Sequence, residues 1–262
     1  MSTSAISLAG VTKRFGKFTA VDRLDLEVPR GVTFGIIGPN GAGKTTTIRM
    51  VMNIMKPDEG EIRVLGERMS DRLQERIGYL PEERGLYRKM KVIDQLLFFA
   101  EIKGVDKATA LKRLGPWLES MDLSPWLQKK TEELSKGMQQ KIQFLGTIVH
   151  DPEGLILDEP FSGLDPMNVI LLKEFLAEFK RQGKTVVFST HVLEQAEKLC
   201  DRIALIYRAK KLLDGGIKEI KHSFRDRVPL PPPVEPEPEL EKIFIKVVEE
   251  SGLSAPTAEE LK

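Results

Sequence analysis

Cysteine is almost missing from this chain, because Cys200 is the only one in 262 residues. A single thiol cannot close a disulfide within the chain, so a small disulfide-stapled scaffold is excluded and a reducing cytosol is favoured. Long apolar runs are missing as well: the longest, such as residues 95–100, fall far below the roughly 18 residues of a membrane span. Residues 1–16 lack a basic start followed by an apolar segment, so we expect neither a membrane span nor a secretion signal.

The chain also has almost no net charge. Lysine and arginine number 40 against 39 aspartates and glutamates, which gives a formal charge of +1 at pH 7. No overall field therefore favours nucleic acid or an anionic lipid surface, and we expect no nucleic-acid partner. With 41% hydrophobic and 30% charged residues, the composition is that of a soluble globular protein. The length of 262 residues predicts one large domain with a smaller appended segment.

Hydrophobic patterning predicts an α/β fold with two kinds of sheet. Residues 23–28 alternate polar and apolar side chains, and residues 4–11 do so similarly, which is typical of half-buried strands in an antiparallel sheet. Residues 32–37, 154–157 and 185–190 are short apolar or β-branched runs, as in strands buried on both faces of a parallel sheet. Ligands of such folds bind beyond the carboxyl ends of the strands, where Gly38, Asp158, Glu159 and His191 follow.

Three further segments complete the expected organisation. Helical periodicity between about 88 and 150 predicts a helical subdomain, inserted in a main domain of residues 1–222. Residues 223–239 are interpreted as a proline-rich, semi-rigid linker. Residues 240–262 begin with an amphipathic helix. We expect it to dock on this chain's own domain or on a second copy. The alternative is a helix that lies on the membrane surface, which is disfavoured because the polar face is mixed in charge and not basic. Its apolar stripe consists of Leu240, Ile243, Phe244, Val247 and Val248.

The segment after the first buried strand matches the pattern of a phosphate-binding loop and precedes a helix expected over residues 46–55. Its glycines let backbone amides curl around phosphates. Lys44 is expected to neutralise the β and γ phosphates, and the Thr45 hydroxyl to ligate Mg²⁺. The candidate nucleotide-binding residues here are Gly38, Pro39, Asn40, Gly41, Ala42, Gly43, Lys44, Thr45 and Thr46.

Asp158 and Glu159 directly follow the second buried strand. Two adjacent carboxylates at the end of an apolar strand need a cation or solvent, and the phosphate-binding loop supplies the cation. We expect Asp158 to hold Mg²⁺ through water and Glu159 to polarise the water that attacks the γ-phosphate.

Six elements in this order resemble those of the ABC ATPase family, over residues from about 4 to 220. Besides the loop and the carboxylates, residues 134–138 (Leu-Ser-Lys-Gly-Met) stand in place of the family's signature Leu-Ser-Gly-Gly-Gln, and residues 162–165 (Ser-Gly-Leu-Asp) match its D-loop. His191 matches the switch histidine, and Phe15 falls where the family has an aromatic ring that stacks on adenine. The resemblance implies that Glu159 and His191 are catalytic.

The signature region and Glu82 depart from the family pattern. Ser135 and Gly137 remain at the start of a helix expected over residues 138–149, whose unpaired amides favour an anion. The resemblance implies that they cap the γ-phosphate bound to a second copy, so that ATP joins two chains head to tail. Glu82 stands where most members carry glutamine: it is either an oxygen ligand of Mg²⁺ beside Thr45 and Asp158, or a residue that faces a membrane partner.

The resemblance thus implies an ATP-binding and ATP-hydrolysing motor subunit of a membrane transporter, with ATP and Mg²⁺ as cofactors. Its partners would be a transmembrane permease, which holds it at the cytoplasmic face of the cell membrane, and a second ATPase subunit, identical or related. Residues 77–87 are especially similar to those of detached ATPase subunits of bacterial exporters, which favours export. The alternative is an ABC ATPase of the translation or DNA-repair type. Such proteins usually carry two nucleotide domains, or coiled-coil or zinc-binding inserts.

Four side chains belong to no motif. His150 and His222 are interpreted as surface residues. Trp117 and Trp126, each preceded by proline, are interpreted as packing anchors of the helical subdomain, with a groove for a permease helix as the alternative.

Overall fold

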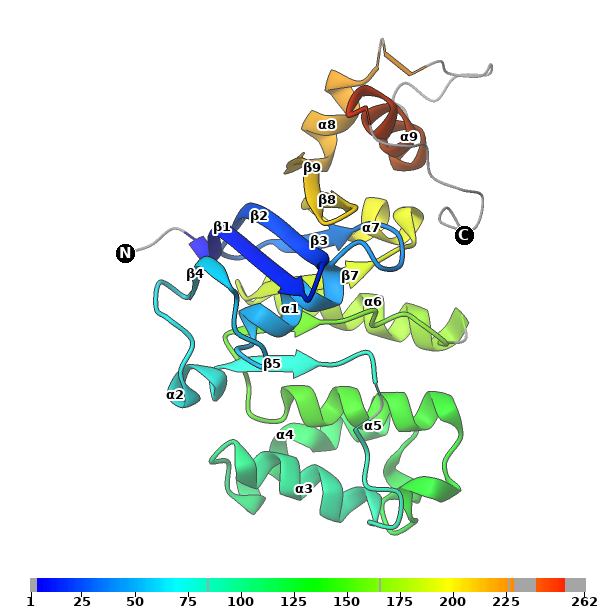
Figure 1. Ribbon diagram of the computed structural model, residues 1–262. Coiled ribbons are helices and arrows are strands. Elements are labelled where there is room, and N and C mark those ends of the chain that lie inside the picture. The colour runs from blue at the N-terminus through cyan, green and yellow to red at the C-terminus, as the bar shows by residue number, and fades with distance from the viewer. Residues whose placement is uncertain (1–3, 84, 165, 226, 229–238, 253–262) are drawn as a thin grey trace, which may run out of the picture.

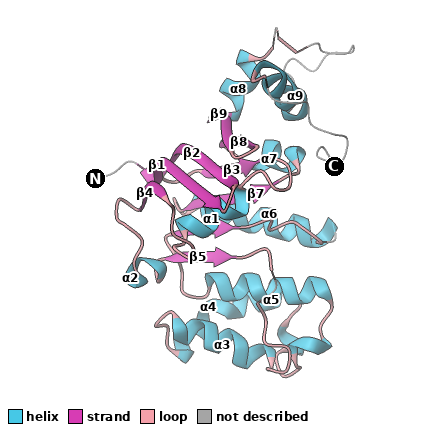
Figure 2. Ribbon diagram, in the orientation of Figure 1, coloured by secondary structure: helices cyan, strands magenta, loops and turns pink. Residues whose placement is uncertain are grey.

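An antiparallel sheet lies at the start of the chain, as the alternating pattern predicts (Figures 1 and 2). The computed structural model describes residues 4–83, 85–164, 166–225, 227–228 and 239–252. The sheet has the strand order β2-β1-β4, with β1 (Ser4–Phe15), β2 (Phe18–Pro29) and β4 (Glu59–Val64). The patterned segments 4–11 and 23–28 fall inside β1 and β2, which pair antiparallel.

The second sheet has six strands in the order β5-β6-β7-β3-β8-β9. The first five run parallel, and β9 pairs antiparallel with β8 at the edge. The predicted parallel-sheet α/β fold is therefore confirmed. The strands are β3 (Thr33–Ile37), β5 (Ile77–Leu80), β6 (Gly154–Leu157), β7 (Thr185–Thr190), β8 (Arg202–Tyr207) and β9 (Lys210–Gly216).

Both faces of this sheet are covered, which explains why its strands are continuously apolar. One face packs against α1 (Lys44–Val51) and the antiparallel sheet, through Phe34, Ile36 and Ile156 among others. On the other face, one half of the sheet packs against the helical insert and α6 (Pro166–Arg181). The other half packs against α7 (Leu193–Leu199), α8 (Ile217–Ser223) and α9 (Leu240–Glu250).

The helical insert contains α3 (Val92–Ile102), α4 (Lys107–Ser120) and α5 (Lys136–Ile148). Figure 1 shows these three helices grouped at one end of the molecule, while α8 and α9 lie at the opposite end. A short helix, α2 (Asp71–Gln74), precedes β5 and is capped by Ser70, whose hydroxyl accepts a hydrogen bond from Leu73 N. Among the helices that the structure describes, none combines the length and apolar character needed to cross a bilayer.

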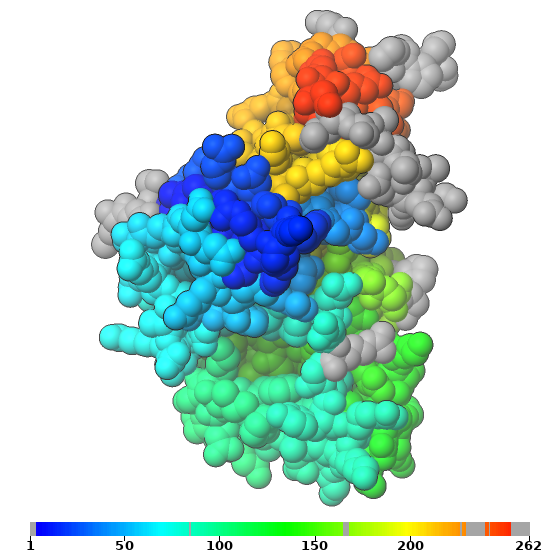
Figure 3. All heavy atoms as spheres, in the orientation of Figure 1, coloured from blue at the N-terminus to red at the C-terminus, as the bar shows by residue number. Residues whose placement is uncertain are grey.

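The C-terminal helix α9 lies on the chain's own core (Figure 3). Its five predicted stripe residues are all buried, and the Phe244 ring meets the Tyr207 ring edge-on with centroids 5.7 Å apart. Of the proline-rich segment expected before it, residues 229–238 lie outside the described residues.

Two helices differ from their expected ranges. α1 ends at Val51 and not near residue 55, because Asn53 takes a left-handed conformation (φ 55°) that turns the chain away from the helix axis. α5 begins at Lys136, two residues earlier than expected, because the Ser135 hydroxyl caps it by accepting a hydrogen bond from Met138 N at 3.2 Å.

Candidate functional site

The phosphate-binding loop joins β3 to α1 and depends on glycine at two positions. A Cβ atom on Gly38 (φ 153°) would lie 2.0 Å from the carbonyl oxygen of Ile206. On Gly43 (φ 111°) it would lie 2.4 Å from the carbonyl oxygen of Ala20. The backbone can follow this path only without side chains there, and it thereby brings its amides to the start of α1, where anions bind favourably.

Lys44 is buried in this loop. Its ammonium donates hydrogen bonds to the carbonyl oxygens of Gly38, at 2.8 Å, and Pro39, at 3.1 Å. Nζ also lies 3.2 Å from Oε1 of Glu159. The loop and the carboxylate after β6, 115 positions apart in sequence, therefore meet at the carboxyl edge of the parallel sheet.

Asp158 is buried beside Thr45 and Ser189. Its Oδ1 accepts hydrogen bonds from Ser189 Oγ at 2.6 Å and from Thr45 Oγ1 at 3.2 Å. Burial raises the pKa of Asp158 above its ordinary value, although these two hydrogen bonds oppose the shift. Its other oxygen, Oδ2, is buried and has no hydrogen-bond partner among the described residues.

Glu159 connects the lysine to the histidine. Its Oε2 lies 3.0 Å from Nδ1 of His191, so the tautomer with a proton on Nδ1 donates to the carboxylate. Its Oε1 faces Lys44 but makes no hydrogen bond with any described residue. The backbone of Glu159 is left-handed, with φ 46°, a conformation that a residue with a side chain adopts at a cost of about 1–2 kcal/mol.

These oxygens fit Mg²⁺. A magnesium ion is usually held by one or two carboxylates together with waters and substrate phosphates, and Asp158 Oδ2 is a buried carboxylate oxygen that needs a partner. Thr45 places its hydroxyl beside the same carboxylate. Within the part of the chain that the structure describes, no three His, Cys, Asp or Glu side chains form a metal cluster. Asp158 and Thr45 are therefore the side chains that could hold Mg²⁺.

Glu82 lies in the loop after β5 and lines one small cavity with Asp158 and Glu159. The cavity has a volume of about 210 Å³. Glu82 itself is exposed. The structure thus brings Glu82 to the rim of the carboxylate site without a direct contact.

Phe15, Ser135 and Gly137 lie on other parts of the surface. Phe15 ends β1 and is 48% exposed, so it is not a core residue, and the Lys13 ammonium lies 5.7 Å from its ring centroid. Ser135 is exposed at the first turn of α5, and Gly137 is half-buried. α5 belongs to the insert, which Figure 1 shows on the far side of β5 from the antiparallel sheet. Asp165 of the D-loop match lies outside the described residues.

Sequence reasoning missed Ser189. It is the penultimate residue of β7, and its hydroxyl contacts both carboxylate residues of the site. The hydroxyl donates to Asp158 and accepts from Glu159 N at 2.9 Å. A signal existed, since a hydroxyl residue two positions before His191 at the end of a buried strand must lie near the other strand ends.

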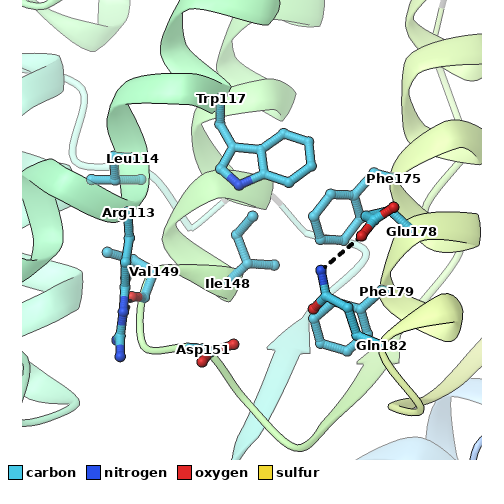
Figure 4. Close-up of a pocket in the computed structure, with 10 residues that line it drawn as sticks. All are labelled: Arg113, Leu114, Trp117, Ile148, Val149, Asp151, Phe175, Glu178, Phe179 and Gln182. Atoms are coloured by element: carbon cyan, nitrogen blue, oxygen red, sulfur yellow. Dashed lines mark hydrogen bonds between the residues drawn. The ribbon is translucent and has the colours of Figure 1, made fainter.

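The hollow in Figure 4 is separate from this site. It has a volume of about 270 Å³ and lies between α4, the end of α5 and α6. None of its lining residues was predicted to bind nucleotide or metal. Trp117 lines it and packs edge-on against Phe175, with ring centroids 4.8 Å apart, as expected of a packing anchor.

His150 corrects one prediction from the sequence. Both of its ring nitrogens are buried without a hydrogen-bond partner in the described residues, so it is not a surface side chain. His150 follows α5 in the chain and lines a cleft together with Lys103 and Tyr79. Burial, and then the charge of Lys103, lowers the pKa of His150 from 6.5 to about 4. His222, by contrast, is exposed as expected.

Comparison with solved structures supports the fold. An ATP-binding subunit of an ABC transporter superposes with a TM-score of 0.84 and 27% identity, over 94% of this chain and 100% of the other. The cbiO1 protein of Clostridium perfringens, part of the ABC transporter complex cbiONQ, superposes with a TM-score of 0.73 and 24% identity, over 86% and 96%.

Relatives identified by sequence are more similar to this chain in percentage identity. The profile of the ABC transporter family matches residues 21–162. YhaQ of Bacillus subtilis (strain 168), an uncharacterised ABC transporter ATP-binding protein, is 50% identical over 219 residues, which cover 84% of this chain and 74% of the relative. Nod factor export ATP-binding protein I of Ralstonia nicotianae is 36% identical over 222 residues, 84% of this chain and 69% of the relative. With the phosphate loop and paired carboxylates joined at one sheet edge, these matches show that the chain belongs to the ATP-binding, ATP-hydrolysing subunits of ABC transporters.

Proposed function

We propose that this chain binds Mg-ATP between its phosphate-binding loop and the carboxylates after β6, and hydrolyses it to drive a membrane exporter. The observation that carries the proposal is the chain of contacts from Lys44 through Glu159 to His191. Lys44 and His191 each contact the carboxylate of Glu159, the residue that we propose as the base. A cation beside a positioned carboxylate base supports hydrolysis of a phosphoanhydride.

Each side chain has a distinct role in this proposal. The loop amides and Lys44 hold the phosphates, and Thr45 and Asp158 hold Mg²⁺, which when bound offsets charge on the phosphoryl oxygens. Glu159 accepts a proton from the attacking water, while the Nδ1 proton of His191 keeps its carboxylate oriented. Glu82 at the cavity rim is an additional oxygen donor toward the metal. Phe15, exposed at the end of β1, stacks on the adenine ring.

A second copy completes the site. Ser135 and Gly137 stand at the exposed N-terminus of α5, a helix of 13 residues, where unpaired amides attract an anion. They belong to the insert and not to the half of the molecule that carries the phosphate loop. We therefore propose a head-to-tail dimer in which these residues cap the γ-phosphate held by the partner copy, with two Mg-ATP between the chains.

A transmembrane permease is the proposed second partner, and it would place the chain at the cytoplasmic face of the membrane. ATP-binding subunits of ABC transporters work with such components, and cbiO1 is part of the cbiONQ complex. The export direction is supported by relatives named for Nod factor export, several of which are 36–38% identical to this chain. The alternative, a non-transport ABC ATPase, has no such support among these relatives.

The permease contact is proposed to lie in the cleft between the core and the helical insert. This cleft has a volume of about 350 Å³, and two large aliphatic side chains line it while remaining exposed, Ile54 at 59% and Ile102 at 57%. Apolar side chains that face water across a cleft are typical of a surface that receives a partner. An apolar helix of the permease is the occupant that matches this lining.

Replacing both isoleucines by glutamate tests the cleft. The variant Ile54→Glu/Ile102→Glu should hydrolyse ATP like the wild type as an isolated protein, yet fail to co-purify with the membrane-spanning subunit when the two are expressed together. Leu111→Glu, at an exposed apolar residue of α4 outside the cleft, is the matched control and should co-purify normally. Equal recovery of the double variant and the wild type would place the permease contact elsewhere.

Two variants of the purified chain test the catalytic proposal. Glu159→Gln should bind ATP like the wild type and hydrolyse it about 10²-fold more slowly or worse, because a positioned general base typically contributes that much. Lys44→Ala should weaken ATP binding itself, since it removes the cation that holds the phosphates. Nucleotide titration and steady-state phosphate release separate the two effects. Unchanged turnover in Glu159→Gln would reject Glu159 as the base.

A further inference from the structure

Ser189 lies at the sheet edge that carries the proposed catalytic residues. It is fully buried, with 0% exposure, near the end of β7. β7 pairs with β6 so that Leu157 lies opposite Phe188, which places Ser189 next to the residues that follow β6. Because Ser189 is fully buried, its hydroxyl requires specific hydrogen-bond partners.

Those partners are the two carboxylate residues themselves. The amide of Glu159 donates to Ser189 Oγ at 2.9 Å, and Ser189 Oγ lies 2.6 Å from Asp158 Oδ1. Because the amide can only donate, the serine oxygen accepts that bond and directs its own proton to the aspartate. One hydroxyl therefore ties the backbone of the proposed base to the side chain of the proposed metal ligand.

The bond to Glu159 restrains a strained residue. Glu159 has φ 46°, and such left-handed backbone persists only where surrounding contacts hold it. Its amide bond to Ser189 is one of those contacts, and its carboxylate then reaches both Lys44 and His191. Without the serine hydroxyl, the backbone can relax, and the carboxylate moves away from the position that these two contacts define.

The hydrogen bond to Asp158 determines which of the two carboxylate oxygens remains without a partner. Oδ1 receives the hydrogen bonds from both Ser189 and Thr45, which leaves Oδ2 as the oxygen without a partner among the described residues. Fixing Oδ1 in this way fixes the direction in which Oδ2 points. The orientation of the proposed magnesium ligand thus depends on the same hydroxyl.

We propose that Ser189 is a positioning residue for ATP hydrolysis, which acts through Glu159 and Asp158 and touches neither nucleotide nor metal. The proposal rests on the catalytic roles assigned above to these two carboxylates. It adds a residue from β7 to a site otherwise built from the phosphate loop, the end of β6 and His191.

Ser189→Ala is the direct test. We expect kcat to fall between about 10-fold and 100-fold, as for small displacements of a catalytic group. The affinity for ATP measured without Mg²⁺ should stay within about 2-fold of the wild type, because the phosphate loop is intact. The Mg²⁺ concentration for half-maximal activity should rise. Ser189→Thr, which keeps the hydroxyl, should recover most of the lost kcat.

Thr185→Val is the matched control. Thr185 is buried at the opposite end of the same strand, and its hydroxyl likewise accepts a backbone amide, from Gly31 at 2.9 Å. This variant should lose stability and keep its kcat. The proposal is overturned if Ser189→Ala retains kcat within about 2-fold, or if Thr185→Val lowers kcat as much. Slow hydrolysis by Glu159→Gln together with normal hydrolysis by Ser189→Ala rejects only the positioning role, whereas normal hydrolysis by Glu159→Gln rejects the catalytic proposal itself.

Discussion

At the scale of single residues, the sheet edge proposed to be catalytic concentrates features that work against stability. Glu159 has a left-handed backbone, and Asp158 is a carboxylate whose pKa burial raises above its ordinary value. The folded-state pKa of Asp158 lies above that of the unfolded chain, so its contribution favours folding at low pH and is lost as the pH rises through the folded-state value. A bound cation would reverse this effect. The site is thus built for its ligand and not for the free protein.

His150 provides a pH test at the same scale. Its folded-state pKa of about 4 lies below its ordinary 6.5, so the unfolded chain takes up the proton first. The stability that this difference contributes is fully present above pH 6.5 and is lost as the pH falls toward 4. Since one unit of pKa is worth about 1.4 kcal/mol, the loss amounts to about 3 kcal/mol.

We therefore expect His150→Leu to lose about 3 kcal/mol less stability than the wild type between pH 6.5 and pH 4. Urea unfolding at a series of pH values measures this difference. His222→Leu is the control, because His222 is exposed on α8, and it should follow the wild type throughout. Parallel stability curves for His150→Leu and the wild type would show that the imidazole is protonated as easily in the folded state as in the unfolded one.

The residues predicted from sequence were those whose spacing encodes a mechanism. The loop around Lys44 and the pair after β6 could be predicted, because their pattern follows from phosphate and metal chemistry, and the structure brings them within 3.2 Å of each other. His150 could not, since a lone histidine acquires its surroundings from side chains that tertiary packing delivers. The position of Ser189 before His191 places it near the strand ends, but its two hydrogen-bond partners required the structure. The cleft beside Lys103 that buries His150 leaves no local pattern in the sequence.

At the scale of secondary structure, the apolar stripe of α9 predicted this helix. Its apolar residues recur at helical spacing, and all five are buried in the structure. Its docking place required the structure: Glu197 of α7 accepts a hydrogen bond from Leu240 N at 3.2 Å and pairs with Lys221 of α8 at 2.7 Å. α9 is therefore tied to α7, the helix that begins two residues after His191.

Removing the packing of α9 should destabilise the whole domain. Phe244→Ala should lower Tm by on the order of 10 °C, because loss of a buried phenylalanine costs about 3–5 kcal/mol. Truncation after Arg227 should lower Tm further, since it also exposes Tyr207 and its apolar neighbours in β8. Glu249→Ala, at an exposed position of the same helix, should leave Tm almost unchanged. A truncated chain that melts like the full-length protein would show that α9 does not support the core.

At the scale of the whole molecule, the candidate residues lie in two parts of the fold, the parallel sheet and the helical insert. The phosphate loop, the carboxylates and His191 gather at one sheet edge, while Ser135 and Gly137 stand on the helical insert (Figure 1). The sequence predicts both groups and assigns Ser135 and Gly137 to the inserted subdomain, and the structure shows where that subdomain lies. This division is the physical reason for the proposed dimer, in which the loop of one chain and the α5 terminus of another would form the complete site.

The most direct test of this account is the oligomeric state of Glu159→Gln, measured by analytical ultracentrifugation with and without Mg-ATP. Because this variant should retain ATP without hydrolysing it, we predict a monomer without nucleotide and a dimer with it. Adding Ser135→Arg should keep the chain monomeric with ATP while nucleotide binding persists. Ser120→Arg, at an exposed serine of the same insert, should still dimerise. A Glu159→Gln protein that stays monomeric at saturating ATP, or one that dimerises despite Ser135→Arg, would contradict the head-to-tail site.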